Sequence, residues 1–196
     1  MIDSKGRKFL DPAINKTADL LITFNLTANQ VSWLAFIFGF LAAVLVYFNV
    51  LLLGVIFLWF SGFLDSVDGA IARKNDNASA WGTVLDITFD RIVEVVMVIA
   101  LALNYPAANF AMILLLGSII LSMTVFLTVG SVSKRKGIKS FYYQAGFAER
   151  TEGFIFLTLM ILFPSQLLII TLLFAAAITF TAGQRLMEAK RILNKI

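Results

Sequence analysis

Four aspartates stand where two apolar stretches of the sequence meet, at Asp65, Asp68, Asp86 and Asp90. The first two are three residues apart and the last two are four apart, so on helices each pair lies on one face. The short polar segment 75–79 between the pairs predicts antiparallel, neighbouring helices on which all four carboxylates converge. A charge at the centre of a lone membrane helix costs at least about 2.5–3.5 kcal/mol. Carboxylates gathered in such surroundings indicate bound cations or shifted protonation.

The ligand types in the sequence limit which metal ions the aspartates could bind. The chain contains no histidine and no cysteine, and a site made only of oxygen ligands suits Mg²⁺, Mn²⁺ or Ca²⁺ rather than zinc or copper. Two such ions held a few ångströms apart are a recurrent device for displacement at phosphorus. Gly69 and Gly82, beside the aspartates, would let a ligand approach the helix backbone closely. Arg73 is placed to bind a phosphate.

Spacing alone leaves two other interpretations of the aspartates open. Arg73 or Arg91 could neutralise them as structural ion pairs, and transport proteins also bury carboxylates as ion or proton sites. A cation transport protein is less favoured, because the charges gather at one end of the apolar stretches instead of following a path through them.

The elements that must hold these residues are membrane helices. Of the 196 residues, 60% are hydrophobic and only 14% are charged, which is typical of an integral membrane protein. A spanning helix needs about 20 mostly apolar residues. We therefore predict an all-α integral membrane protein with six transmembrane helices preceded by an N-terminal amphipathic surface helix. The predicted spans are Ala28–Asn49, Val50–Lys74, Trp81–Tyr105, Pro106–Ser133, Gly146–Phe163 and Ser165–Arg185.

The basic residues orient these spans. The turns after the first, third and fifth spans contain no lysine or arginine, whereas the opposite side collects them. Short loops rich in lysine and arginine stay cytoplasmic, so we expect both termini and the aspartates on the cytoplasmic side of the cell (inner) membrane. The net charge of +4 serves topology and contact with anionic headgroups, and no nucleic-acid partner is needed.

The first 25 residues differ from the rest. Their apolar positions share one helical face, which predicts an amphipathic helix lying on the inner membrane surface; the alternative is an ordinary frayed terminus. The face consists of Leu10, Ile14, Thr17, Leu21 and Phe24. No internal repeat is evident, so we predict a single membrane domain over 1–196, with a juxtamembrane helix (1–25), a six-helix core (28–185) and a cytoplasmic tail (186–196).

The complete pattern resembles a known family. Asp65-x2-Asp68-Gly69-x2-Ala72-Arg73-x8-Gly82-x3-Asp86-x3-Asp90 matches the signature of the CDP-alcohol phosphatidyltransferase family at all eight fixed positions. The six-span layout with its N-terminal helix is similar to that family over essentially the whole chain. The resemblance implies a transferase in which the hydroxyl of a small polar alcohol displaces CMP from a CDP-linked lipid such as CDP-diacylglycerol.

The resemblance also implies roles for individual residues. Two metal ions, Mg²⁺ or Mn²⁺, would be held by Asp65, Asp68, Asp86 and Asp90. The residue matching Asp90 is in addition the base that takes the proton of the acceptor alcohol. The residues implied to bind CDP are Asp65, Asp68, Gly69, Ala72, Arg73, Gly82 and Asp86. Members of the family are commonly homodimers embedded among membrane lipids, and we expect the same here.

The acceptor alcohol is the least constrained part of the function. A phosphorylated acceptor such as inositol phosphate or glycerol phosphate would favour a basic pocket, for which the candidates are Lys134, Lys136, Lys139, Arg150 and Arg185. The lysines also obey the positive-inside pattern, and Arg150 could form a structural ion pair. Within "AER", Arg150 resembles a segment that contacts the acceptor's phosphate in relatives using inositol phosphate. Transfer of a CDP-linked headgroup to diacylglycerol stays an alternative.

Overall fold

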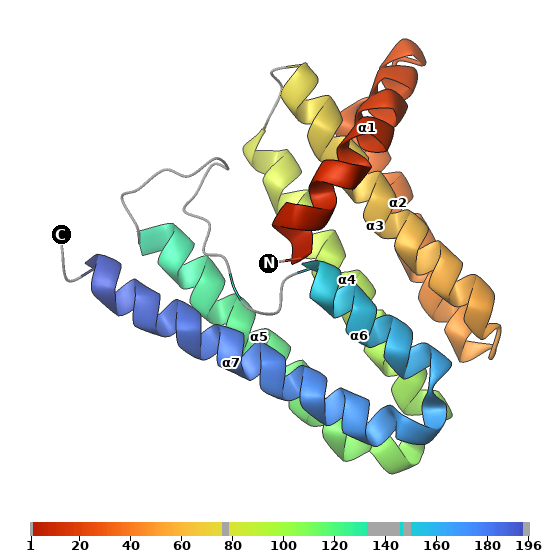
Figure 1. The fold of residues 1–196 in the computed structure, drawn as a ribbon, viewed down its shortest axis with the longest axis vertical. Helices are drawn as coiled ribbons and strands as arrows, with labels where there is room; N and C mark the ends of the chain where they lie inside the picture. The colour runs from red at the N-terminus through yellow and green to blue at the C-terminus, as the bar shows by residue number, and fades with distance from the viewer. Residues whose placement is uncertain (1, 76–78, 133–145, 147–149, 194–196) are drawn as a thin grey trace. The chain divides into compact units, whose positions relative to one another are not determined.

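The computed structural model describes residues 2–75, 79–132, 146 and 150–193, which are helical with short connections and contain no strand (Figure 1). The elements are α1 (Ile2–Thr23), α2 (Ala28–Tyr47), α3 (Leu51–Lys74), α4 (Ala80–Asn104), the 3-10 helix η1 (Pro106–Ala108), α5 (Asn109–Val132), α6 (Arg150–Leu162), the 3-10 helix η2 (Pro164–Gln166) and α7 (Leu167–Leu193). The predicted all-helical class is confirmed.

Four helical stretches among the described residues are long and apolar enough to cross a membrane: 28–47, 51–74, 106–132 and 164–191. The predicted third and fifth spans correspond to α4 and α6. Within its 25 residues, α4 carries Asp86, Asp90, Arg91 and Glu94, and it is not among these four stretches. The described part of α6 has 13 residues, fewer than the roughly 20 that a bilayer requires. In the C-terminal part, α7 continues as a helix to Leu193, past the predicted end of the last span at Arg185.

The chain divides into two compact units, one over residues 2–104 and one over 105–196. In the first unit, α2 packs along both α3 and α4, and α1 packs against α3. In the second unit, α5 and α6 both pack against α7, and the ring of the buried Phe174 stacks on Phe156 with 4.8 Å between centroids. In the first unit, α2 therefore joins α3 to α4, and α3 carries α1.

The start and the end of α2 are both fixed by side chains. At its start, the hydroxyl of Thr27 accepts a hydrogen bond from the backbone N–H of Gln30, and the Gln30 side chain accepts one from the backbone of Thr27. Such a capping box satisfies two backbone donors that a helix start leaves unpaired. At its end, the side-chain amide of Asn104 in α4 donates to the carbonyl of Val46 at 2.9 Å, and Asn49 adopts a positive φ of 61° in the turn to α3.

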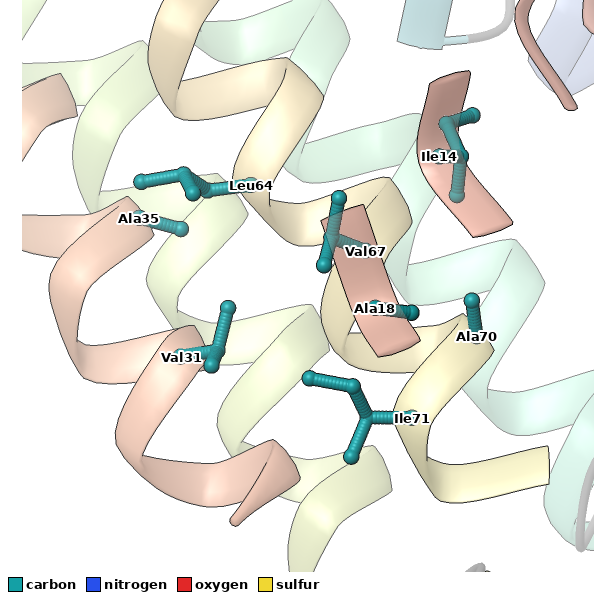
Figure 2. Close-up of a cluster of buried hydrophobic side chains, with 8 residues drawn as sticks. All are labelled: Ile14, Ala18, Val31, Ala35, Leu64, Val67, Ala70 and Ile71. Carbon is teal, nitrogen blue, oxygen red and sulfur yellow. The ribbon is translucent and has the colours of Figure 1, made fainter. Parts of the chain in front are cut away.

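Helix α1 is anchored to the first unit by a small apolar cluster at the C-terminal half of α3 (Figure 2). Its members are Ile14 and Ala18 from α1, Val31 and Ala35 from α2, and Leu64, Val67, Ala70 and Ile71 from α3. Lys74 reinforces the contact by pairing with Asp19 at 2.5 Å and donating to the carbonyl of Asn15 at 3.1 Å. Part of the predicted apolar face of α1 is thus used for packing on protein.

The remaining apolar residues of that face differ in their exposure. Leu21 packs against the cluster, whereas Leu10 and Phe24 are 55% and 67% exposed. Ala18, which is fully buried, lay outside the predicted face. The exposed pair leaves α1 with apolar side chains that a membrane surface could cover.

At Gly39, α2, α3 and α4 approach one another closely. A Cβ added at this position would lie 2.5 Å from Cγ2 of Val93 in α4 and 2.8 Å from Oγ of Ser61 in α3. The Ser61 hydroxyl in turn donates to the carbonyl of Ala35 in α2 at 2.7 Å. The missing side chain at Gly39 therefore allows the three helices to assemble.

We expect Gly39→Ala to destabilise the protein by about 1–3 kcal/mol, because an extra methyl group would overpack this junction. The measurement is the thermal unfolding midpoint in detergent, and Gly39→Ala combined with Val93→Ala should recover part of the loss. Gly117→Ala is the matched control, since nothing lies within 4 Å of a Cβ added there and alanine favours a helix over glycine. A Gly39→Ala midpoint equal to that of the unaltered protein would refute the role given to this glycine.

Candidate active site

Three of the four aspartates come together in the first unit. The carboxylates of Asp65 in α3 and of Asp86 and Asp90 in α4 offer oxygen atoms that all lie within 4.8 Å of one another, and all three residues are half-buried. Both helices are positioned by α2, which packs along each of them. The convergence predicted from the two spacings is therefore observed for these three residues.

The donor set fits a hard divalent cation. Oxygen ligands of Mg²⁺ or Ca²⁺ lie about 2.0–2.6 Å from the ion, so two oxygens on one ion are at most about 4–5 Å apart, as the three carboxylates are here. With no histidine or cysteine anywhere in the chain, no imidazole or thiolate ligand competes for the site. The cluster could hold a metal ion.

Asp68 lies one helical turn after Asp65 and has a different environment. It is buried, and its Oδ2 accepts a hydrogen bond from the hydroxyl of Ser32 in α2 at 2.5 Å. Among the described residues it does not belong to the group of three carboxylates. The structure thus places the fourth predicted metal ligand beside α2.

The other residues of the motif belong to the C-terminal half of α3 and to the start of α4. Arg73 is exposed, and its Nη1 lies 3.3 Å from the position that a Cβ on Gly69 would take, so the guanidinium group folds back over the glycine one turn earlier. Gly82 donates its backbone N–H to the hydroxyl of Ser79 at 3.0 Å. Ala72 is one wall of a cavity of about 220 Å³ between α3 and the turn that joins α1 to α2.

Arg91, the residue after Asp90, forms an ion pair within α4 with Glu94, which lies one turn beyond Asp90. Glu94 is buried and Arg91 is half-buried. The sequence offered Arg91 only as a counter-charge for the four aspartates, whereas the structure gives it a partner in Glu94 on its own helix. This pair stabilises a buried carboxylate in the apolar part of α4.

Sequence reasoning missed the contribution of α2. Besides Ser32, its first turn provides Asn29, whose Oδ1 lies 3.3 Å from the position of a Cβ added on Gly82. Both polar side chains face the helices that carry the aspartates. The usable signal was the Thr27–Gln30 capping box, since it fixes where α2 begins and hence which of its residues lie level with the aspartates.

The candidate acceptor residues belong to the second unit or lie outside the described residues. Arg185 is buried in α7, where its Nη1 donates to the hydroxyl of Ser122 at 3.2 Å and its guanidinium group lies 4.9 Å from the ring centroid of Phe126. Arg150 begins α6 and lies 5.6 Å from the ring of Phe154. The three lysines, Lys134, Lys136 and Lys139, lie outside the described residues.

The fold and the site together define a helical membrane protein that carries a carboxylate cluster suited to a divalent cation. The sequence model of the CDP-alcohol phosphatidyltransferase family matches residues 25–183. The chain belongs to this family of transferases in phospholipid biosynthesis, and the resemblance noted in the sequence is confirmed.

Two curated relatives are similar to the chain over different extents. The archaetidylinositol phosphate synthase of Pyrococcus horikoshii is 29% identical over 192 residues, which cover 97% of this chain and 98% of the relative. The bifunctional IPC transferase and DIPP synthase of Archaeoglobus fulgidus is 30% identical over 128 residues, which cover 63% of this chain. The matched residues make up only 26% of that longer protein.

A similar crystal structure is that of the Mycobacterium tuberculosis phosphatidylinositol phosphate synthase (PgsA1) with CDP-DAG bound. It matches with a TM-score of 0.75 and 25% identity, covering 90% of this chain and 92% of that chain. The same mycobacterial protein in complex with manganese and citrate has a TM-score of 0.75 and 23% identity, covering 90% and 88% of the two chains. The second match shows the similarity of fold.

Proposed function

We propose that the protein transfers a phosphatidyl group from a CDP-linked lipid to the hydroxyl group of a small polar alcohol and releases CMP. The observation that carries this proposal is the cluster of Asp65, Asp86 and Asp90, held within 4.8 Å on apolar helices in a chain that belongs to the CDP-alcohol phosphatidyltransferase family. The CDP-DAG bound to the mycobacterial relative supports CDP-diacylglycerol or a similar lipid as the donor.

The aspartates have two tasks in this proposal. Asp65, Asp68, Asp86 and Asp90 hold two ions of Mg²⁺ or Mn²⁺, which when bound offset negative charge on the pyrophosphate and on the departing CMP. Asp90 accepts the proton of the acceptor hydroxyl. The acceptor oxygen then forms a bond to the β-phosphorus, the bond from that phosphorus to the CMP oxygen breaks, and CMP leaves with the bonding electrons.

The rest of the motif binds the nucleotide part of the donor. Arg73 is exposed beside Gly69, where a guanidinium group can form two parallel hydrogen bonds to a phosphate. Gly69 and Gly82 let the donor approach the helix backbone. Ala72 lines a cavity of about 220 Å³ at the C-terminal end of α3.

For the acceptor we propose inositol phosphate, with glycerol phosphate as the alternative. The inositol phosphate synthases among the similar proteins support the first choice. We assign the acceptor's phosphate to a basic pocket, and the buried guanidinium group of Arg185 is one of its members. The proposed members are Arg150, Arg185, Lys134, Lys136 and Lys139. The transport alternative loses its support because the family is one of transferases.

We also propose a membrane arrangement for the working protein. The chain crosses the cell membrane six times as one domain, α1 lies on the inner surface, and both termini and the active site are cytoplasmic. The four apolar helices and the absence of lysine and arginine from alternate turns support this topology. A homodimer is the proposed assembly, by analogy with the family.

The proposed reaction is tested by CMP release from CDP-diacylglycerol with purified protein and Mg²⁺ or Mn²⁺. Inositol 1-phosphate should give release well above the rate without acceptor, whereas inositol, its matched control without the phosphate, should not. The panel also includes glycerol 3-phosphate and serine as acceptors. A separate reaction, with a CDP-linked headgroup as donor and diacylglycerol as acceptor, tests the alternative direction of transfer. Failure of every acceptor with CDP-diacylglycerol, in a protein that still binds this lipid, would refute the proposed donor–acceptor pair.

A further inference from the structure

Ser32 makes a direct contact between α2 and the aspartate motif. It is 7% exposed, as is Asp68, and its Oγ lies 2.5 Å from Oδ2 of Asp68. Asp68 is on α3, 36 residues away in the sequence. A hydroxyl group within this distance of a carboxylate oxygen forms a short, charge-assisted hydrogen bond.

The direction of this hydrogen bond follows from the chemistry of its partners. An ionised carboxylate has no proton and only accepts, whereas a serine hydroxyl has a single proton to donate. The Ser32 Oγ also lies 3.1 Å from the carbonyl oxygen of Ala28, a longer contact to a neutral acceptor. The proton is therefore directed to Asp68. This hydrogen bond uses only one of about four lone-pair directions of a carboxylate, so accepting it does not by itself prevent Asp68 from binding a cation.

The position of Ser32 is itself well determined. It lies five residues after the capping box residue Thr27 and belongs to the face of α2 that is buried with Val31 and Ala35. The same turn of α2 presents Asn29 towards Gly82 of α4. A serine held in this way restricts the rotation of the Asp68 side chain, because the hydrogen bond is lost when the carboxylate turns away from α2.

We propose that Ser32 is a positioning residue of the metal centre: its hydroxyl group holds the Asp68 carboxylate in the orientation in which it binds the divalent cation. This inference rests on the proposed function in taking Asp68 as a ligand. Hydrogen-bond partners of metal ligands commonly change metal affinity or activity by about 10–100-fold when they are removed. Ser32 binds neither substrate nor metal itself and acts through Asp68.

The test compares Ser32→Ala with Ser32→Thr, which keeps a hydroxyl group. Binding of Mn²⁺ is measured by the loss of the free-ion electron paramagnetic resonance signal, and CMP release is measured against Mn²⁺ concentration. Ser32→Ala should raise both the dissociation constant of Mn²⁺ and the half-saturating Mn²⁺ concentration by about 10–100-fold. Ser32→Thr should restore most of the affinity.

Ser61→Ala is the matched control for a purely structural role. Ser61 is also buried, and its hydroxyl also joins α3 to α2, but it donates to the backbone carbonyl of Ala35 at 2.7 Å instead of to a carboxylate. This variant should lower the thermal midpoint and leave the affinity for Mn²⁺ unchanged. Each variant is first shown to unfold cooperatively in detergent.

The outcomes separate this inference from the proposed function. Suppose that the unaltered protein releases CMP. If Ser32→Ala then binds Mn²⁺ as tightly as the unaltered protein, Ser32 is not a positioning residue. Equal losses of Mn²⁺ affinity in Ser32→Ala and Ser61→Ala would overturn it as well, because a general loosening of α2 and α3 would then explain both. If the unaltered protein releases no CMP, the proposed transfer fails. The role of Ser32 is still retained if Ser32→Ala binds Mn²⁺ more weakly than the unaltered protein and Ser61→Ala does not.

Discussion

Replacing Asp90 with asparagine is expected to lower CMP release by about 10²–10⁴-fold, the range in which general base catalysis contributes. The amide cannot accept the proton of the acceptor hydroxyl, and its nitrogen also replaces one oxygen of the three-carboxylate cluster. The fold should be retained, since the side chain keeps its size and one of three mutually repelling charges is removed. The measurement is the initial rate of CMP release, accompanied by the thermal midpoint.

Asp19→Asn is the matched control for Asp90→Asn. It makes the same chemical change in the same unit, at a side chain that is 67% exposed and pairs with Lys74, and exposed pairs contribute at most about 1 kcal/mol. Its activity should be close to that of the unaltered protein. A large excess of Mn²⁺ separates the two tasks of Asp90, metal binding and proton acceptance. If excess Mn²⁺ restores the activity of Asp90→Asn, Asp90 is a metal ligand and not the base. If Asp90→Asn is nearly as active as the unaltered protein without excess Mn²⁺, Asp90 has no part in the mechanism.

The sequence predicted the helices well because hydrophobic stretches of this length have few alternatives. The ends of the predicted first span, at Ala28 and Asn49, lie within two residues of those of α2. The start of α2 also carries a local signal in Thr27 and Gln30. The end of α7 was less predictable: polarity rises after Arg185, but the residues up to Leu193 still favour a helix.

The site was predictable to the extent that it depends on helical spacing. Asp86 and Asp90 had to share a face of α4, and a short connection had to bring them near Asp65 of α3. The partner of Asp68 was not predictable in this way, because Ser32 belongs to another helix and nothing in its local sequence identifies a carboxylate as its acceptor. Contacts between helices depend on crossing positions, which close approaches such as Gly39 against Val93 determine.

The case of α1 shows why an amphipathic pattern alone does not decide what covers a face. An apolar stripe can pack against a membrane or against protein. Ile14 is buried against α3, whereas Leu10 and Phe24 are exposed. The ion pair between Lys74 and Asp19 joins two residues that are far apart in the sequence, so their partnership could not be read from the pattern of α1.

Metal removal should also lower activity strongly. Treatment with EDTA followed by its removal is expected to reduce CMP release by at least about 10²–10³-fold, because stabilisation of the transition state by bound metal is worth several kcal/mol and each 1.36 kcal/mol is a factor of ten. Mg²⁺ or Mn²⁺ should restore the activity. Zn²⁺ should restore much less, since it favours tetrahedral sites with histidine or cysteine, and the chain contains neither.

The control for this experiment is the same treatment with EDTA already saturated with Mg²⁺, which should leave the rate unchanged. The thermal midpoint supplies a second readout: because the carboxylates of Asp65, Asp86 and Asp90 lie within 4.8 Å of one another, their repulsion without a cation should lower it, and Mn²⁺ should raise it again in proportion to binding. A protein stripped of metal, as verified by elemental analysis, that still released CMP at the original rate would show that the cluster does not act through a cation.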